Sequence, residues 1–476
     1  MESTFQQRVL FIRDIESELN AIPHDGIPVG SLLSDTLLLK VLQAPQPPSC
    51  WAVMKDIVRL CRWMFRSLMP PADTAPLAAF HGRVCFTLLS GSNKLKDLIL
   101  PIADQFPGMQ QVIAGCSSQT DETLTSHPYF PAHRYLHGGS PKTLLHFLRM
   151  WPRWRKAIRQ VCDRHEFGCR PLPHLRLVLF AQLLHVAQAK RLIRALQPTC
   201  VVTEYDRNGT AACLVLAARK AGIPTVTLIH GIVNPDYGYT PLLADIALCW
   251  GEQHREKLME GGTPPERLAI AGNPRLKEKT PLRRETPQKT ECGQEKPTIL
   301  FASQALDAEK RHGFMDAFCQ VAARLYNSAD FRVRLHPSEK TEFYQEEQQK
   351  YPFVKIESSH GSSVEDSIAA ADYVVTWGSG FGYDALVYGT PVILFNLFNE
   401  ESKHVNDLIQ KAKCPVATSP MQLAELITGL LSTPETRGMF HEKSEEFSRY
   451  FVYARGEWAA KNSAAQIRAQ IAKQRA

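Results

Sequence analysis

The sequence lacks the features that mark several large classes of protein. It has no run of eighteen or more apolar residues, the length that a membrane-spanning helix requires. Its twelve cysteines form no CxxC pair, and the cluster Cys162, His165 and Cys169 offers only three of the four ligands of a structural zinc site. Zinc-finger spacing, RNA-binding motifs and dense Lys/Arg tracts are also missing. We therefore expect neither a bound metal nor a nucleic-acid partner.

The charge balance and the first residues of the chain predict its location in the cell. No secretory leader is recognisable in residues 1–20, and unpaired cysteines are typical of the cytosol, so we expect a cytoplasmic protein. A formal charge of +7 favours an anionic substrate or an anionic membrane surface. Residues 144–161 and 176–196 each combine apolar residues with Arg or Lys, as amphipathic helices do. They can face a protein core, the commoner case, or lie peripherally on the inner face of the cytoplasmic membrane.

The length and the alternation of the chain predict two domains. A chain of 476 residues exceeds what one hydrophobic core normally serves. Short apolar runs alternate with helical stretches over 199–271 and 298–395, as in βαβ units of a parallel sheet. We predict an α/β fold of two tandem, doubly wound, Rossmann-like domains. The expected division is a helical N-terminal extension at 1–80, a first Rossmann-like domain at 81–275 with a helical insertion at about 125–198, a linker at 276–297, a second Rossmann-like domain at 298–445 and a C-terminal helix at 446–476.

A glycine-rich turn in the second domain has the pattern of a phosphate site. Gly378, Ser379 and Gly380 stand where an apolar strand is followed by a helix, and Asp384 lies in the first turns of that helix. Free backbone N–H groups and the positive end of the helix can hold a phosphate there. In open α/β sheets, ligands bind at this carboxyl edge of the strands.

Other polar residues follow predicted strands in the same way. They are Glu204 and Asp206, His230, Arg275, and Arg334 with His336. Each has an ordinary structural explanation, since an Asp before a helix is usually its N-cap and a lone His is usually a hydrogen-bonded structural residue. Their shared position at strand ends favours a functional site.

These segments resemble GT-B glycosyltransferases, and more narrowly the proteins of that fold in bacterial capsule and surface-polysaccharide biosynthesis. The resemblance covers residues 199–396. It rests on IHG at 229–231, CWGEQHREKLMEGG at 249–262, GNPR at 272–275, RLHPSE at 334–339 and GSGFGYDALVYGTPVI at 378–393. It implies that the first Rossmann-like domain serves the acceptor and that the second binds a nucleotide-sugar.

The resemblance also implies roles for individual residues. His336, in the step His336–Pro337, corresponds to the residue that contacts the donor phosphate, and Ser379 with Gly380 to a second phosphate contact. Asp384 stands where many GT-B enzymes keep a glutamate on the nucleotide ribose, and the shorter side chain is a departure from that pattern. Arg334 or Arg275 would add positive charge for the leaving group, without a metal or a further cofactor.

The residue that accepts the proton of the acceptor hydroxyl stays open at this level. Sialyltransferase-like members use an acid of the first domain, whereas glycerophosphotransferase-like members have a His–Gly step, and this chain has both. The sequence narrowly favours Asp206 over His230, with Glu204 third.

The resulting prediction is a glycosyltransferase that moves a sugar from a CMP- or UDP-linked donor to a growing surface glycan or a lipid-linked acceptor. The alternatives are a CDP-glycerol-type glycerophosphotransferase, a UDP-sugar 2-epimerase, which shares the two-domain fold, and a non-catalytic scaffold that binds a nucleotide or a glycan. The sequence specifies neither the nucleotide nor the acceptor.

Overall fold

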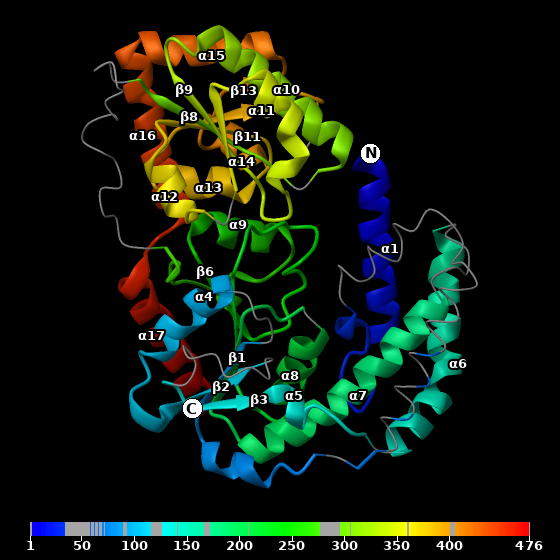
Figure 1. The fold of residues 1–476 in the computed structure, drawn as a ribbon. Helices are drawn as coiled ribbons and strands as arrows, with labels where there is room; N and C mark the ends of the chain where they lie inside the picture. Colours follow the sequence, from blue (N-terminus) through cyan, green and yellow to red (C-terminus); the bar gives the residue numbers. More distant parts are fainter. Residues whose placement is uncertain are drawn as a thin grey trace. The chain divides into compact units, whose positions relative to one another are not determined.

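A computed structural model shows two compact units, each built on a parallel sheet (Figure 1). Unit 1 comprises Met1–Leu276 and Tyr453–Ala476, and unit 2 comprises Lys277–Val452. The two Rossmann-like sheets confirm the predicted fold class. The structure describes residues 2–33, 58, 61, 65, 69–70, 72–88, 93–115, 126–139, 141–165, 172–207, 209–276, 296–304, 306–358, 361–399 and 405–475.

The sheet of unit 1 has seven strands in the order β3-β2-β1-β4-β5-β6-β7, and all of its neighbouring pairs are parallel. The order reverses direction at β1, as at the switch point of a doubly wound sheet. The strands are β1 (Val84–Leu88), β2 (Gln111–Gly115), β3 (Tyr129–Pro131), β4 (Cys200–Thr203), β5 (Thr225–Leu228), β6 (Ile246–Cys249) and β7 (Leu268–Ile270).

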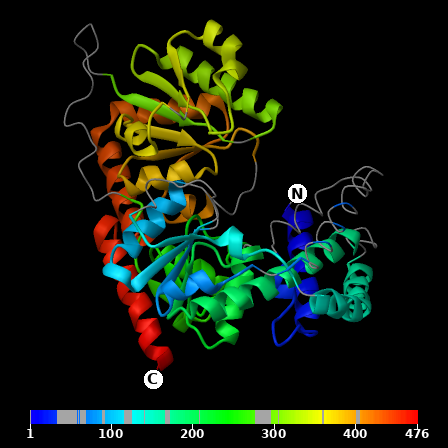
Figure 2. The ribbon, with the colours of Figure 1, turned by 60° about the horizontal axis from the view of Figure 1, so that its bottom comes forward.

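Helices cover both faces of this sheet because alternate strand residues point to opposite sides. On one face, Phe86 and Val202 belong to a core with α4 (Asn93–Ala103) and α17 (Gly456–Arg475). On the other face, Cys85 and Val201 pack with α7 (Leu172–Leu196) and α8 (Gly209–Lys220). Figure 2 shows α17 running along unit 1, to which the chain returns after α16 (Pro434–Phe451).

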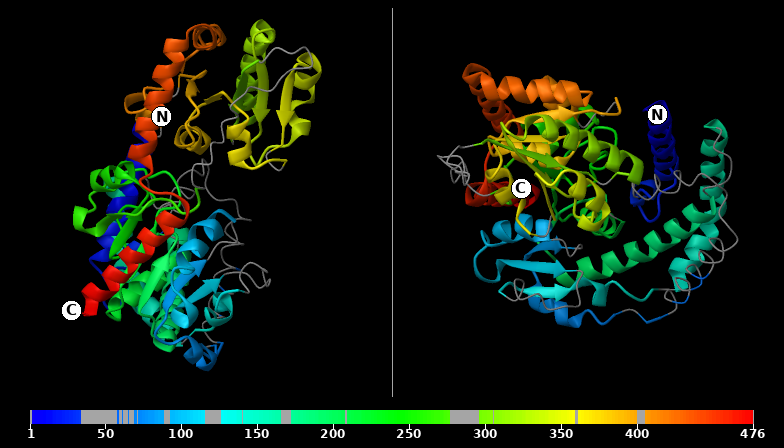
Figure 3. Two further views of the ribbon diagram at one scale, coloured as in Figure 1. Left: turned by 90° about the vertical axis from the view of Figure 1, so that its left-hand side faces the viewer. Right: turned by 45° about the horizontal axis from the view of Figure 1, so that its top comes forward.

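A separate helical layer lies at one end of α7. It consists of α1 (Glu2–Asn20), α6 (Pro141–Arg164) and the first half of α7 (Figure 3). Phe11, Trp154 and Phe180 belong to the core of this layer. These helices contain the first part of the extension predicted at 1–80 and the two amphipathic segments. Most of the extension between residues 34 and 71 falls outside the described residues.

Short elements complete unit 1. They are the 3-10 turns η1 (Gly30–Leu32), η2 (Ala75–Phe80), η3 (Gly108–Gln110) and η5 (Pro265–Arg267), and the helices α5 (Ala132–Tyr135) and α9 (Glu252–Glu260). At Gly30 of η1, an added Cβ would lie 2.0 Å from the backbone oxygen of Glu16, so only glycine allows this close approach to α1.

The sheet of unit 2 has six parallel strands in the order β10-β9-β8-β11-β12-β13. They are β8 (Thr298–Ala302), β9 (Asp330–Arg334), β10 (Val354–Glu357), β11 (Tyr373–Thr376), β12 (Val392–Phe395) and β13 (Val416–Ala417). The accompanying helices are α10 (Ala308–Leu325), η6 (Thr341–Tyr344), α11 (Gln345–Lys350), α12 (Val364–Ala369), α13 (Gly380–Val387), α14 (Asn406–Gln410), α15 (Pro420–Ser432) and α16. Stacked phenylalanines, among them Phe301 on Phe318, fix α10 to the sheet.

The C-terminal part differs from one continuous helix at 446–476. Helix α16 ends at Phe451, Tyr453 donates its N–H to the Trp250 carbonyl at 2.8 Å, and α17 begins at Gly456. The linker predicted at 276–297 lies outside the described residues except for Leu276, Lys296 and Pro297.

Candidate active site

The carboxyl edge of the unit 1 sheet gathers three of the predicted residues. Glu204 follows β4, His230 follows β5, and Arg275 follows β7. His230 and Arg275 are close enough for the guanidinium charge to lower the imidazole pKa. The Arg275 guanidinium also lies 5.7 Å from the centre of the Trp250 ring, a cation–π contact that fixes its position.

The contacts of His230 define which ring nitrogen carries the proton. Its Nδ1 lies 2.8 Å from the backbone carbonyl oxygen of Glu204, and a carbonyl oxygen can only accept a hydrogen bond. Nδ1 therefore carries the hydrogen of the neutral ring. Among the described residues none bonds to Nε2, which keeps its lone pair. This tautomer is the one that a general base requires.

A buried tyrosine supports the same ring. The Tyr239 hydroxyl oxygen accepts the backbone N–H of His230 at 2.9 Å and lies 2.7 Å from Nδ1. Burial raises the pKa of Tyr239 well above its ordinary value, so the phenol stays neutral. Burial of His230 lowers its own pKa, although its hydrogen bond to Glu204 acts in the opposite direction. The imidazole is therefore neutral at pH 7.

The two carboxylates after β4 have mainly structural partners. The Asp206 side chain is 0% exposed, and one of its oxygens accepts the N–H groups of Leu243 and Ala244, each at 2.7 Å. Burial raises the pKa of this carboxyl group. Glu204 is also buried, and its carboxylate accepts the Thr87 hydroxyl at 3.0 Å. Asp206 thus holds the chain before β6 and cannot meet a substrate hydroxyl in this conformation.

In unit 2, the predicted donor residues share the carboxyl edge of one sheet. His336 follows β9 and Ser379 follows β11, with β8 between these two strands. Two strand spacings amount to about 10 Å, so the two backbone positions do not touch. The structure therefore brings His336 and Ser379 to one edge on either side of Ser303, the residue after β8.

The imidazole of His336 has the opposite tautomer to that of His230. The Ser338 N–H donates to Nδ1 at 3.2 Å, and the Ser338 hydroxyl lies 2.8 Å from the same nitrogen. Because Nδ1 accepts, the hydrogen of the neutral ring is on Nε2. Among the described residues, none accepts a hydrogen bond from this Nε2–H group. An Nε2–H group suits a phosphate oxygen.

A buried carboxylate shapes the turn that presents His336. Glu339 accepts the His336 N–H at 2.8 Å and the Tyr344 hydroxyl at 2.7 Å, and it bonds the Ser303 hydroxyl. The turn also closes through the Glu339 N–H and the His336 carbonyl oxygen at 2.8 Å, with Pro337 exposed between them. Glu339 therefore connects the ends of β8 and β9.

The glycine-rich turn has the predicted strand-to-helix geometry. Gly378 has a φ of +69°, which favours glycine, and the Ser379 hydroxyl caps α13 by accepting the Phe381 N–H at 3.2 Å. A hydroxyl that accepts one bond can still donate its proton to a phosphate. Gly380 is exposed as the first residue of α13, and Asp384 lies one turn further on.

Arg334 is engaged inside the protein. Its guanidinium donates to the hydroxyls of Ser362 and Ser367 at 2.7 and 2.6 Å and to the Ser362 carbonyl oxygen at 2.8 Å. Burial lowers its pKa. These bonds fix the segment before α12, and we therefore leave Arg334 out of the proposed donor ligands.

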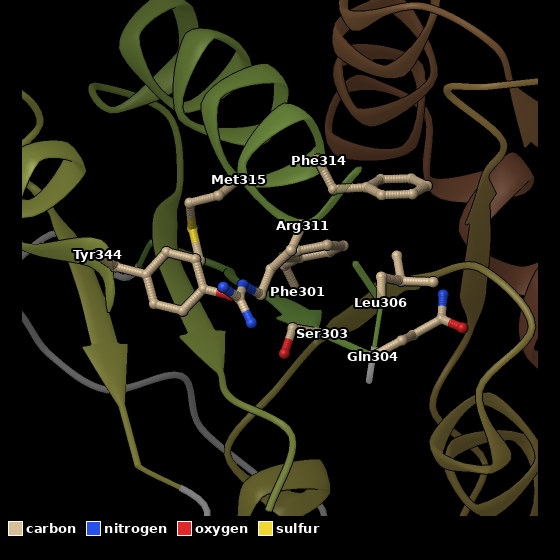
Figure 4. A pocket seen from close by; sticks show the side chains of 8 residues that line it. All are labelled: Phe301, Ser303, Gln304, Leu306, Arg311, Phe314, Met315 and Tyr344. Carbon is tan, nitrogen blue, oxygen red and sulfur yellow. The ribbon is translucent and has the colours of Figure 1, made fainter. Parts of the chain in front are cut away.

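A cation that sequence analysis did not identify lies beside the His336 turn. Arg311 of α10 contributes to a small pocket next to Ser303, and Figure 4 shows its guanidinium pointing toward Tyr344. It is 4.7 Å from the centre of the Phe343 ring and 4.0 Å from a Glu339 carboxylate oxygen. No local motif surrounds Arg311 in the sequence, whereas Glu339 belongs to the RLHPSE segment and could have been found there.

No protein-family model and no curated protein matches this sequence. Among solved structures, the chain is similar to a protein from Listeria monocytogenes that carries the provisional name UDP-N-acetylglucosamine 2-epimerase. The identity is 14%, the TM-score is 0.53, and the match covers 82% of this chain and 98% of the other. At this identity the likeness establishes the fold and leaves the reaction open.

Two further structures match less well. They are a UDP-GlcNAc 2-epimerase from Neisseria meningitidis bound to UDP-GlcNAc (13% identity, TM-score 0.46, 82% of this chain and 100% of the other) and the lipopolysaccharide outer core galactosyltransferase WaaB in its apo form (14%, 0.48, 81% and 99%). These likenesses are too slight to carry an argument. Within the part of the chain that the structure describes, no group of three or more His, Cys, Asp or Glu side chains is arranged to hold a metal ion.

Proposed function

We propose that the chain is a glycosyltransferase that transfers a sugar from a nucleotide-linked donor to a hydroxyl of a surface glycan or a lipid-linked acceptor. The observation that carries the proposal is the pair of imidazoles at the carboxyl edges of the two sheets. His230 has the tautomer of a base and His336 has the tautomer of a donor to phosphate. The proposal assigns proton transfer to unit 1 and binding of the donor phosphate to unit 2.

The proposed step forms one bond and breaks one. The acceptor oxygen bonds to the anomeric carbon as its proton moves to Nε2 of His230. The bond from that carbon to the phosphate oxygen breaks, and the nucleotide leaves with the bonding electrons. His336, Ser379 and the first N–H groups of α13 stabilise the added negative charge of the leaving phosphate.

Nucleotide binding provides the first test. We expect one of CMP, CDP, UDP or GDP to raise the melting temperature, since ligand at 100 times its Kd stabilises a protein by about 2.7 kcal/mol. His336→Ala should weaken that nucleotide about 10- to 100-fold, because a hydrogen bond to a charged group is lost. The matched control is His441→Ala, since the His441 ring bonds the Gly389 carbonyl oxygen at 3.1 Å.

This control should bind the nucleotide as the parent does. If none of the four nucleotides shifts the melting temperature, the proposed function is wrong. If His336→Ala binds as tightly as His441→Ala, the phosphate contact lies elsewhere in unit 2.

A second candidate is transfer of a glycerol-phosphate-type unit from a CDP-linked donor. The favouring observation is that Asp206 is buried whereas His230 has a base-like tautomer, because the resemblance associates the His–Gly step with this class. The acceptor oxygen would then bond to phosphorus, and CMP would leave. Mass spectrometry of the product distinguishes the two, since only this reaction adds a phosphate to the acceptor.

We further propose that α6 contacts an anionic membrane surface. Its exposed face carries Arg149, Arg153, Arg155, Lys156 and Arg159, and no acidic residue occurs between 141 and 160. Leu145 and Leu148 of the same helix are 70% and 53% exposed. Cations beside exposed apolar side chains are complementary to anionic lipid headgroups. None of the helices in the described part of the chain is long and apolar enough to cross a bilayer.

Vesicle flotation tests this surface. The full chain should bind phosphatidylglycerol-containing vesicles and not phosphatidylcholine vesicles, and the double variant R153E/K156E should weaken binding at least about tenfold, since each basic residue contributes about 1 kcal/mol. The control R324E/K355E reverses two exposed cations of unit 2. Equal losses in both double variants would mean that overall charge, and not α6, drives binding.

A further inference from the structure

The N-terminal helix α1 contacts the loop that carries His230. This loop occupies residues 229–245, between β5 and β6. The Arg13 guanidinium donates to the Asp236 carbonyl oxygen at 3.0 Å and to the Thr240 hydroxyl oxygen at 3.2 Å, and it also contacts the Thr240 carbonyl oxygen. One side chain of α1 thus binds three oxygens at two positions of the loop.

A buried ion pair makes the second connection from α1. Glu16 accepts two hydrogen bonds from the Arg207 guanidinium, at 2.8 and 2.9 Å, and these two residues are 4% and 1% exposed. Arg207 also approaches the Pro241 carbonyl oxygen of the loop at 3.5 Å. Arg13 bonds Glu16 at 3.2 Å, so the two connections share one carboxylate.

The anchored part of the loop is directly connected to the imidazole. Thr240, which Arg13 binds, follows Tyr239, whose hydroxyl oxygen holds the backbone N–H of His230 and lies against Nδ1. The Thr240 hydroxyl donates to the Pro235 carbonyl oxygen at 2.9 Å and so closes the loop upon itself. A displacement of Thr240 would therefore move Tyr239 and tilt the His230 ring.

We infer that α1 is part of the catalytic apparatus, with Arg13 and Glu16 acting as positioning residues for His230. This inference rests on the proposed role of His230 as the base. It gives the N-terminal extension a specific task, which is to hold the 229–245 loop so that Nε2 keeps its orientation. Misplacement of a catalytic group by about 1 Å can cost about 100-fold in rate.

The competing explanation is that α1 merely completes a helical core through Phe11 and Ile15. Arg164 allows the two to be separated. It ties α6 to α1 through Asp14 and Glu18, at 3.3 and 3.1 Å, and no such bond of Arg164 reaches the loop. Arg164→Ala therefore removes an ion pair of α1 and leaves the contacts of Thr240 in place, whereas Arg13→Ala removes the contacts of α1 with Thr240.

The experiment compares these variants in the full chain, with release of nucleotide from the preferred donor as the activity. Arg13→Ala should lower kcat about 10- to 100-fold with the donor KM unchanged, and Arg13→Lys should recover part of the loss. Arg164→Ala should keep the parent kcat. If Arg13→Ala and Arg164→Ala behave alike, the inference is wrong.

A titration of His230 by NMR gives a readout independent of turnover. The groups that face the ring are the Glu204 carbonyl oxygen, Tyr205, Tyr239 and the Arg275 charge. Release of the loop exposes the imidazole to water, so its pKa should rise toward the ordinary value of about 6.5 in Arg13→Ala and not in Arg164→Ala. The pKa that describes the acidic limb of the pH–rate profile should rise together with the pKa of His230.

Thr240→Val provides a second variant, because it removes one acceptor of Arg13 and leaves the bond from Arg13 to Glu16 in place. Like Arg13→Ala, this variant should lower kcat, and an unchanged kcat would count against the inference. A fully active His230→Asn would instead refute the proposed base, whatever Arg13→Ala does. Failure of the inference about α1 can therefore be distinguished from failure of the proposed role of His230.

Discussion

His230→Asn will lower turnover of the preferred donor by about 100- to 10,000-fold, the range expected for the loss of a general base. Asparagine is chosen because its side-chain NH₂ can replace Nδ1–H as the donor to the Glu204 carbonyl oxygen. The loop contact is then preserved while the basic Nε2 is removed. Steady-state nucleotide release, with nucleotide affinity measured in parallel by calorimetry, checks the prediction.

Nucleotide affinity should stay within about twofold of the parent, because His230 lies in unit 1 and the proposed phosphate ligands lie in unit 2. Turnover close to that of the parent would exclude His230 as the base. Glu204→Gln would then be the next variant, since Glu204 is the remaining candidate carboxylate at that edge. Asp206→Asn is less informative, because its effect on the packed chain at Leu243 and Ala244 would confound the result.

The pH dependence follows from the same residue. A base must be unprotonated to act, and burial lowers the pKa of His230 below its ordinary value near 6.5. Activity should therefore be retained on acidification through pH 6.5 and be lost only as the pH falls through the lower pKa of the folded protein.

Arg207→Met will destabilise unit 1 by about 3–5 kcal/mol, the usual cost of removing one partner of a buried ion pair. Arg207 is 1% exposed and makes two short bonds to Glu16, so its loss leaves the buried Glu16 carboxylate of α1 without this partner. Arg13 reaches only one of the two carboxylate oxygens and is itself partly exposed. Urea unfolding followed by circular dichroism, with hydrogen exchange to locate the transition in unit 1, measures the loss.

The double variant Glu16→Met/Arg207→Met should recover most of that stability, because two apolar side chains replace the pair without leaving a buried charge. Arg164→Met is the matched control, since it removes an ion pair to the same helix at a side chain that is 54% exposed, and it should leave the unfolding midpoint nearly unchanged. If the double variant were less stable than Arg207→Met, the ion pair would stabilise unit 1 by more than the neutralisation of its two buried charges.

The strand-end pattern predicted where several of the candidate residues lie in the fold. His230, Arg275, His336 and Ser379 do lie at the carboxyl edges of parallel strands, because buried β-runs followed by glycine or polar residues fix both the strand and the place where it ends. The pattern could not decide whether Asp206 or His230 is the general base. Both follow strands, and only their burial and hydrogen bonds distinguish a carboxylate that holds a loop from an imidazole whose Nε2 bonds none of the described residues.

The residues that sequence reasoning did not identify have hydrogen-bond or packing partners that are far away in the sequence. Arg13 and the loop at Thr240 are 227 residues apart, and Glu16 and Arg207 are 191 apart. Helix α17 likewise packs Ala460 and Ala464 against α4 of unit 1 after the chain has built unit 2. Nothing in the local sequence around any of these residues specifies its partner.

The amino-acid sequence by itself determined the two parallel α/β units and the glycine-rich strand-to-helix turn, since periodicity and backbone freedom are local properties. Only the tertiary structure decided which nitrogen of each neutral imidazole carries the proton, which carboxylate is enclosed, and that α1 contacts the His230 loop. Those properties depend on solvent exclusion and on hydrogen-bond partners that distant segments supply.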